Sequence, residues 1–116
     1  MKLINAGSGE VLLDQLEVAD TFWKRFKGLQ FRRSMPHGSG LLLSPCSSLH
    51  TCFMRFPIDV VMLDRDRVVI GIRTRIDPWR AVICESGTKQ VIEMNSGSLT
   101  IATGTQLHWH DEPSAC

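Results

Sequence analysis

The sequence lacks a strong net charge, a long hydrophobic run and a phosphate-binding loop. Its 13 Lys and Arg residues against 12 Asp and Glu residues leave a formal net charge of +1, so no overall field attracts nucleic acid or an anionic membrane. No segment approaches the ~20 apolar residues that cross a bilayer, and no signal-peptide core precedes Glu10. Neither Gly7-Ser8-Gly9 nor Gly38-Ser39-Gly40 is followed by Lys-Ser or Lys-Thr. We therefore predict a cytoplasmic protein with no membrane span, and nucleic acid is disfavoured as a partner.

The cysteines also give little support for disulfide bonds. The four cysteines stand at positions 46, 52, 84 and 116, and they allow three disulfide connectivities. In a chain without a secretory signal, thiols are ordinarily reduced. We therefore expect free cysteines.

What is present favours strands. At 116 residues the chain has the length of one domain, and short apolar runs are separated by turn residues at the spacing of sandwiches and barrels. We predict a mostly β, compact single domain over 1–116, sandwich-like, jelly-roll-like or barrel-like, with a mobile tail at 111–116. One short helix is expected near residues 20–27, capped by Asp20 and stopped by Gly28. Predicted strands are 10–18, 58–63, 68–72, 81–85, 90–94, 99–102 and 106–110, and residues 34–40 are a predicted loop.

The most informative segment is 49–64, a nearly unbroken apolar run that contains His50, Arg55 and Asp59. A buried, unpaired charge is costly, so such groups should pair, bind a ligand or line a cleft. In a regular strand over 50–56, His50, Cys52 and Met54 share one face. A bend at Pro57 could bring Arg55 to Asp59, either as a structural ion pair or with Arg55 free to bind a carboxylate or phosphate.

Two further chemistries use residues of this segment. Cys46, His50 and Cys52, with a second pair at His108 and His110, have permissive but unspecific spacing for a metal ion. Alternatively, His50 could act as a base with Cys52 or Asp59 in a hydrolase, although no family-specific cysteine-hydrolase pattern surrounds them. We predict no cofactor.

A basic segment at 24–33 contains five cations and no acid, with Phe26 and Phe31 between them. Such a pattern is typical of an anionic partner surface or of a solvated helix face. It gives a third hypothesis, an accessory protein that docks on an acidic partner through this segment.

The order of several motifs resembles a known family. The matching pieces are 25–32 (RFKGLQFR), 40–43 (GLLL), 50–64 (HTCFMRFPIDVVMLD), Pro78-Trp79 and 91–94 (VIEM), with Gly97 and Gly104. Over residues 9–108 the chain resembles the domain of unknown function 192 family, also called uncharacterised protein family 0127. The resemblance implies a compact β-sandwich or jelly-roll-like fold and no established activity. Arg67 stands where relatives usually have a hairpin glycine. The positions matched by motif, without a known role, are Arg25, Gly28, Arg32, Met54, Pro57, Ile58, Asp59, Pro78, Glu93 and Gly104.

Our leading hypothesis from the sequence is a non-enzymatic binding module for a small anionic ligand or a partner's peptide. Polar groups that converge beside an apolar run are the usual composition of a ligand site. The candidate binding residues are Arg32, Arg33, His50, Met54, Arg55 and Asp59.

Overall fold

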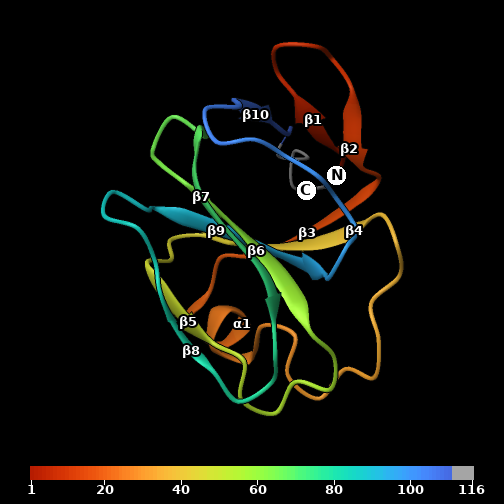
Figure 1. Cartoon of the computed structure of the whole chain (residues 1–116), viewed down its shortest axis with the longest axis vertical. Helices are drawn as coiled ribbons and strands as arrows, with labels where there is room; N and C mark the ends of the chain where they lie inside the picture. The colour runs from red at the N-terminus through yellow and green to blue at the C-terminus, as the bar shows by residue number, and fades with distance from the viewer. Residues whose placement is uncertain (111–116) are drawn as a thin grey trace, which may run out of the picture.

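The computed structural model describes residues 1–110, except for the side chains of Phe22 and Trp23. A central five-stranded sheet separates two layers (Figure 1). A three-stranded sheet, near which the N-terminus lies, covers one face. The short helix α1 and a two-stranded sheet cover the other face. This arrangement confirms the mostly β class with one short helix, in its sandwich-like form. The predicted tail at 111–116 lies outside the described residues.

The central sheet has the order β3-β4-β9-β6-β7, and the flanking sheets have the orders β10-β1-β2 and β5-β8. Among the strands of residues 1–110, only β3 and β4 pair in parallel, and the other neighbours are antiparallel. The strands are β1 (Leu3–Asn5), β2 (Val11–Leu13), β3 (Gln15–Ala19), β4 (Ser39–Leu43), β5 (Ser48–His50), β6 (Ile58–Leu63), β7 (Val69–Ile76), β8 (Ala81–Ile83), β9 (Gln90–Asn95) and β10 (Leu107–His108).

Two hydrophobic cores lie on opposite faces of the central sheet because its strands are apolar at both alternating sets of positions. Strand β6 is buried at every residue. Its Val61 and Leu63 belong to the core under the three-stranded sheet, whereas Val60 and Met62 belong to the core under α1 and β5. A charged side chain on β6 or β9 therefore has an interior environment on either face.

Helix α1 spans Phe22–Lys27. Its N-cap is Thr21, whose Oγ1 accepts the Lys24 N–H at 3.2 Å, and not Asp20 as the sequence suggested. Both residue types cap well, and the structure uses the one that adopts extended backbone next to the first turn. Gly28 ends the helix as predicted, with φ +48°. Over residues 1–110, no helix is long and apolar enough to cross a membrane.

Several predicted strands differ in the structure. Residues 51–57 contain a turn at 52–53 and a bend at 55–56, not the strand considered for 50–56, and β6 begins only at Ile58. The predicted strand at 10–18 is divided at Asp14 into β2 and β3, which join different sheets. Residues 99–102 form no strand, and β1, β4 and β5 were not predicted as strands.

The hairpin between β6 and β7 accommodates an arginine in place of glycine. Arg67 has φ +63°, a conformation that L-residues adopt only with strain. Its side chain is held at the same time, because the guanidinium lies 3.8 Å from the Trp109 ring centroid and Nη1 donates to the Trp109 carbonyl. Asp64 stabilises the turn by accepting the N–H groups of residues 66 and 68.

Candidate functional site

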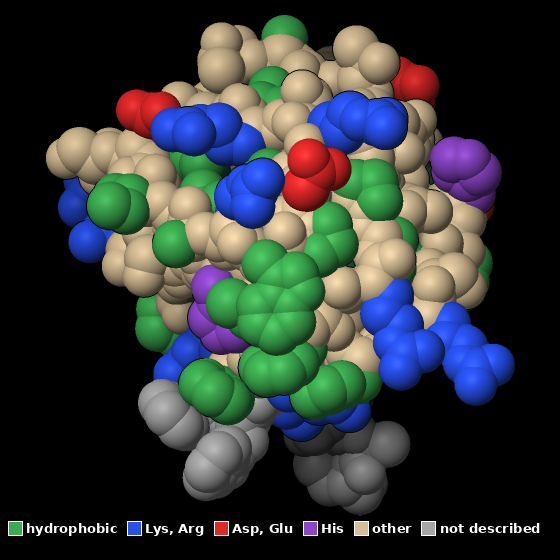
Figure 2. Space-filling view, turned by 60° about the horizontal axis from the view of Figure 1, so that its bottom comes forward, with side chains coloured by type: hydrophobic (Ala, Val, Ile, Leu, Met, Phe, Trp, Pro, Cys, Tyr) green, Lys and Arg blue, Asp and Glu red, His purple; other side chains and the backbone are tan. Residues whose placement is uncertain are grey.

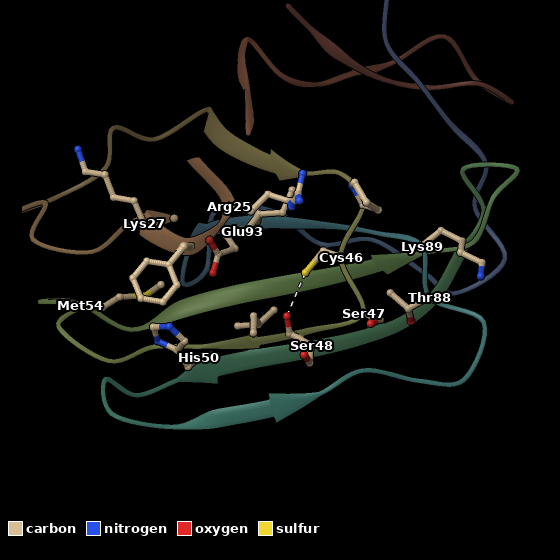
Figure 3. Close-up of a pocket in the computed structure, with 15 residues that line it drawn as sticks. Arg25, Lys27, Cys46, Ser47, Ser48, His50, Met54, Thr88, Lys89 and Glu93 are labelled. Atoms are coloured by element: carbon tan, nitrogen blue, oxygen red, sulfur yellow. Dashed lines mark hydrogen bonds between the residues drawn. The ribbon is translucent and has the colours of Figure 1, made fainter. Parts of the chain in front are cut away.

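A pocket of about 580 Å³ opens beside α1, on the side of the central sheet that carries β5 and β8. Its walls come from α1, the end of β4, the connection from β4 to β5, β5 itself, Met54 after β5, the turn before β9 and one residue of β9. Figure 3 places Met54 and His50 at one end and Thr88 and Lys89 at the other, with Glu93 between them. The lining residues are Arg25, Phe26, Lys27, Gly28, Leu43, Pro45, Cys46, Ser47, Ser48, Leu49, His50, Met54, Thr88, Lys89 and Glu93.

Glu93 is the chemically unusual group of this pocket. It lies in the middle of β9, only 1% exposed, and its carboxyl group points into the space below α1 (Figure 3). Its Oε1 has no hydrogen-bond partner within the described protein. Burial raises the pKa of Glu93 to about 8, although the positive charge of Arg32 acts in the opposite direction. At neutral pH the group is therefore mostly a carboxylic acid, which can donate as well as accept a hydrogen bond.

The end of α1 leaves room for this carboxyl group. A Cβ atom on Gly28 would lie 3.1 Å from Glu93 Oε1, closer than ordinary van der Waals contact. The left-handed φ of Gly28 also disfavours any larger residue. The glycine that stops the helix is thus also the residue that lets Glu93 reach the pocket.

The cations around Glu93 come from two sides of the pocket. Arg25 and Lys27 project from α1, and Lys89 precedes β9. Arg25 Nη1 donates to the backbone carbonyls of Asp20, at 2.8 Å, and Ser44, at 3.4 Å, which fixes its guanidinium at the edge of the pocket. Apart from Glu93 no carboxylate lines the pocket, within the part of the chain that the structure describes. When Glu93 is protonated, the side chains that line the pocket carry a net positive charge.

Two other polar side chains of the pocket have fixed partners. Cys46 Sγ donates to the Ser48 carbonyl at 3.1 Å (Figure 3), and burial raises the pKa of this thiol to about 11. His50 Nδ1 accepts the Cys52 N–H at 3.2 Å, so the neutral ring carries its proton on Nε2. The His50 ring also meets the Phe26 ring edge-on at 6.0 Å between centroids.

The structure brings together only some of the residues singled out from the sequence. His50 and Met54 both line the pocket. Asp59 does not, because it pairs in register with Met94 and so faces the core under the three-stranded sheet. Its Oδ1 accepts the Arg75 N–H at 2.8 Å, and its Oδ2 accepts the Gly97 N–H at 3.0 Å. These bonds tie three segments of backbone together.

The three candidate arginines lie outside the pocket lining. Arg32 pairs with Glu17, with 3.0 Å between Nη2 and Oε2. Arg33 and Arg55 are exposed, and over residues 1–110 neither forms an ion pair within 4 Å. Asp59 and Arg55 are therefore not joined as the ion pair that a bend at Pro57 could have made.

The residues considered for a metal are divided between two sides of the molecule. Cys46 and His50 line the pocket, and Cys52 follows β5. His108 and His110 lie at β10, with their Nε2 atoms 3.1 Å apart and their rings edge-on. In residues 1–110 no three His, Cys, Asp or Glu side chains are grouped so that they could hold a metal ion. Cys46, Cys52 and Cys84 are free thiols.

Sequence reasoning did not select Glu93 as a site residue, although a signal for it exists. Glu93 stands alone among apolar residues in Val91-Ile92-Glu93-Met94. The rule that a charge inside an apolar run must find a partner applies there as it does to Asp59. Asp59 is satisfied by backbone, whereas Glu93 is not, and only the structure distinguishes them.

The comparisons with known proteins agree with this fold. The family model DUF192, described as an uncharacterized ACR, matches residues 3–109. The chain belongs to the DUF192 family. A UPF0127 protein of Thermococcus sibiricus is 33% identical over 117 residues, and the match covers 95% of this chain and 75% of that protein. A UPF0127 protein of Pyrococcus furiosus is 30% identical, covering 93% of this chain and 97% of its own.

A solved structure is similar in fold. The crystal structure of a protein of unknown function from Novosphingobium aromaticivorans superposes with a TM-score of 0.79 at 23% identity, covering 93% of this chain and 82% of that one. These relatives establish the family and the fold of this small β protein. Their names carry no activity, so the chemistry of the pocket is the basis for a function.

Proposed function

We propose that this protein is a non-enzymatic binding module and that the pocket beside α1 holds a small anionic ligand. The observation that carries the proposal is Glu93, a buried carboxylic acid with a free Oε1 that faces a pocket bordered by cations. The protonated acid donates a hydrogen bond to an anionic oxygen, and Arg25, Lys27 and Lys89 supply attraction. Leu43, Leu49 and Met54 offer apolar surface to the rest of the ligand.

The state of the thiol and the histidine supports binding without chemistry. A thiol whose pKa is about 11 stays protonated at neutral pH, and the thiol form is a poor nucleophile. The His50 nitrogen that could accept a proton already accepts the Cys52 N–H, and Asp59 belongs to the opposite face of the sheet. The hydrolase hypothesis therefore has no geometric support that matches the support for binding.

The ligand class is tested with matched acid and amide probes. We expect hexanoate and benzoate to shift the backbone NMR signals of His50 and Glu93, and expect hexanamide and benzamide to do so much less. The affinity for the acids should fall as the pH rises through about 8, because deprotonated Glu93 repels an anion. If the amides bind as well as the acids, or if no probe perturbs the pocket signals, the proposal is wrong.

Helix α1 supplies a matched pair of variants for this test. Lys27 lines the pocket, whereas Lys24, three residues earlier and also exposed, does not. Lys27→Gln should weaken carboxylate binding about two- to fivefold, the effect of one exposed charge. Lys24→Gln should leave it unchanged. Equal effects of the two variants would indicate general attraction of anions and no defined site.

A further inference from the structure

Three aromatic side chains form an exposed cluster outside the pocket. Phe31, Phe53 and Trp79 are 59%, 48% and 58% exposed, although large aromatic residues are ordinarily buried. The Phe31 and Phe53 rings stack with 5.2 Å between centroids, and the Trp79 ring meets Phe53 edge-on at 4.7 Å. The three residues come from three separate segments, so the cluster is assembled by the fold and not by a local sequence motif.

The backbone at all three positions has an uncommon conformation. Phe31, Phe53 and Trp79 have φ values of +65°, +62° and +65°, and for bulky residues positive φ is a rare and strained state. Such strain persists only where the surrounding structure imposes it, and it gathers at functional sites. Here the strained backbone carries exposed rings, so packing of the hydrophobic core does not account for the strain.

Hydrogen bonds join the segments that carry the rings. The Phe31 N–H donates to the Phe53 carbonyl at 3.0 Å, and the Trp79 N–H donates to the Thr51 carbonyl at 3.0 Å. Buried Thr51 also donates from Oγ1 to the Asp77 carbonyl and accepts the Arg80 N–H. The cluster is therefore held on a fixed frame, which lowers the entropy cost of binding a partner.

Each ring is followed by arginine in the sequence. Arg33, Arg55 and Arg80 stand within two residues of Phe31, Phe53 and Trp79, and all three are exposed. We name these six residues the aromatic–arginine surface. Figure 2 is turned so that the bottom of the molecule in Figure 1 comes toward the viewer. It shows a broad hydrophobic patch with Lys and Arg side chains on several sides of it. Aromatic residues and arginine are the residue types that dominate binding energy at protein interfaces.

We propose that the aromatic–arginine surface docks a segment of another protein in which an apolar side chain is flanked by Asp or Glu. The apolar side chain would pack on the rings, and the acids would meet the arginines. A second copy of this chain fits poorly, because two such surfaces face to face would oppose arginine to arginine. Nucleic acid fits poorly as well. The Phe31 and Phe53 rings stack on each other, so their facing surfaces are not available for stacking with bases.

The test is a selection from a displayed library of random dodecapeptides on the whole protein. We expect the selected peptides to combine an apolar residue with flanking Asp or Glu, and to bind more weakly as salt rises. Trp79→Ser should weaken the best peptide about 30-fold, as loss of an interface hot spot does. Arg55→Glu should weaken it about tenfold through charge repulsion. Ile83→Ser, which removes another exposed apolar side chain, and Arg65→Glu, an exposed hairpin arginine, are the matched controls.

Several results would overturn the proposal. They are selection of no peptide, selection of peptides without acids, or equal binding by wild type, Trp79→Ser and Arg55→Glu with folded NMR spectra. Tighter binding of oligothymidylate than of any peptide, followed by a tryptophan fluorescence change that Trp79→Ser abolishes, would assign the surface to nucleic acid instead. None of the six residues of the aromatic–arginine surface lines the pocket. Lys27→Gln should therefore leave peptide binding unchanged while it weakens carboxylate binding.

Discussion

Asp59 and Glu93 lie on neighbouring strands of the central sheet, and both are buried, at 5% and 1% exposure. Register places Asp59 beside Met94 and Glu93 beside Val60, so their side chains point to opposite faces. Asp59 receives two backbone N–H bonds. Glu93 has an oxygen with no partner in the described protein, and its pKa is raised to about 8. Similar residues in neighbouring strands thus have opposite hydrogen-bonding environments.

The difference teaches how to separate a structural acid from a binding acid. A carboxylate that accepts several backbone N–H bonds is stabilised as an ion and ties segments of chain together. A buried acid without such partners is expensive as an ion, so it remains protonated and available to whatever enters beside it. Burial alone identifies neither; the partners of the two oxygens do.

The largest expected effect at a single pH comes from removing the structural acid. Asp59→Ala should lower the free energy of unfolding by about 3–4 kcal/mol, because two charge-assisted hydrogen bonds are lost and two N–H groups lose their acceptor. Urea unfolding measures this loss. Asp77→Ala, at an exposed acid of a nearby turn, should change it by less than about 0.5 kcal/mol. The folded fraction of Asp59→Ala should still bind carboxylate probes, and a loss below about 1 kcal/mol would contradict the structural role of Asp59.

The second effect is a pH dependence that only Glu93 should produce. The unfolded chain releases this proton near pH 4.5, whereas the folded protein holds it up to about pH 8. The stabilisation from the retained proton is complete below pH 4.5 and is lost as the pH rises to 8. Between these values the wild type should lose about 1.4 kcal/mol of unfolding free energy per pH unit relative to Glu93→Gln.

Denaturant unfolding at several pH values measures this difference. Glu10→Gln, at a glutamate whose side chain is exposed in the folded protein, should track the wild type. A parallel course of wild type and Glu93→Gln between pH 4.5 and 8 would mean that Glu93 is solvated and unlike the acid described here.

The sequence predicted the parts of the fold that local chemistry controls. The runs at 58–63 and 90–94 are strands within one residue of their predicted bounds, because continuous apolar sequence suits a strand buried on both faces. The helix stop at Gly28 was also predicted, since glycine tolerates the positive φ that occurs there. Strands β1 and β5, of three residues each, carry too little pattern to be recognised and form through their tertiary partners.

The candidate site was predictable only in part. His50 and Met54 were selected from the sequence and do line the pocket. The partners of a buried acid depend on which distant N–H groups reach it, as Arg75 and Gly97 reach Asp59. No spacing in the sequence specifies such contacts. The cluster of Phe31, Phe53 and Trp79 likewise depends on three segments meeting through backbone hydrogen bonds.

The smallest expected effect asks whether the Glu93 carboxyl group is as fixed in place as that of Asp59. A Cβ on Gly28 would press on Glu93 Oε1 at 3.1 Å, whereas a Cβ on Gly104, which also has positive φ, meets nothing within 4 Å. Gly104→Ala therefore measures the backbone strain alone, about 1 kcal/mol. Gly28→Ala should cost about 1 kcal/mol more, and this excess should vanish when Glu93→Ala is also present, as a double-mutant cycle would show. If Gly28→Ala costs no more than Gly104→Ala, the Glu93 carboxyl group moves freely in its pocket. If the excess survives in the Glu93→Ala background, it arises from the helix end and not from the acid.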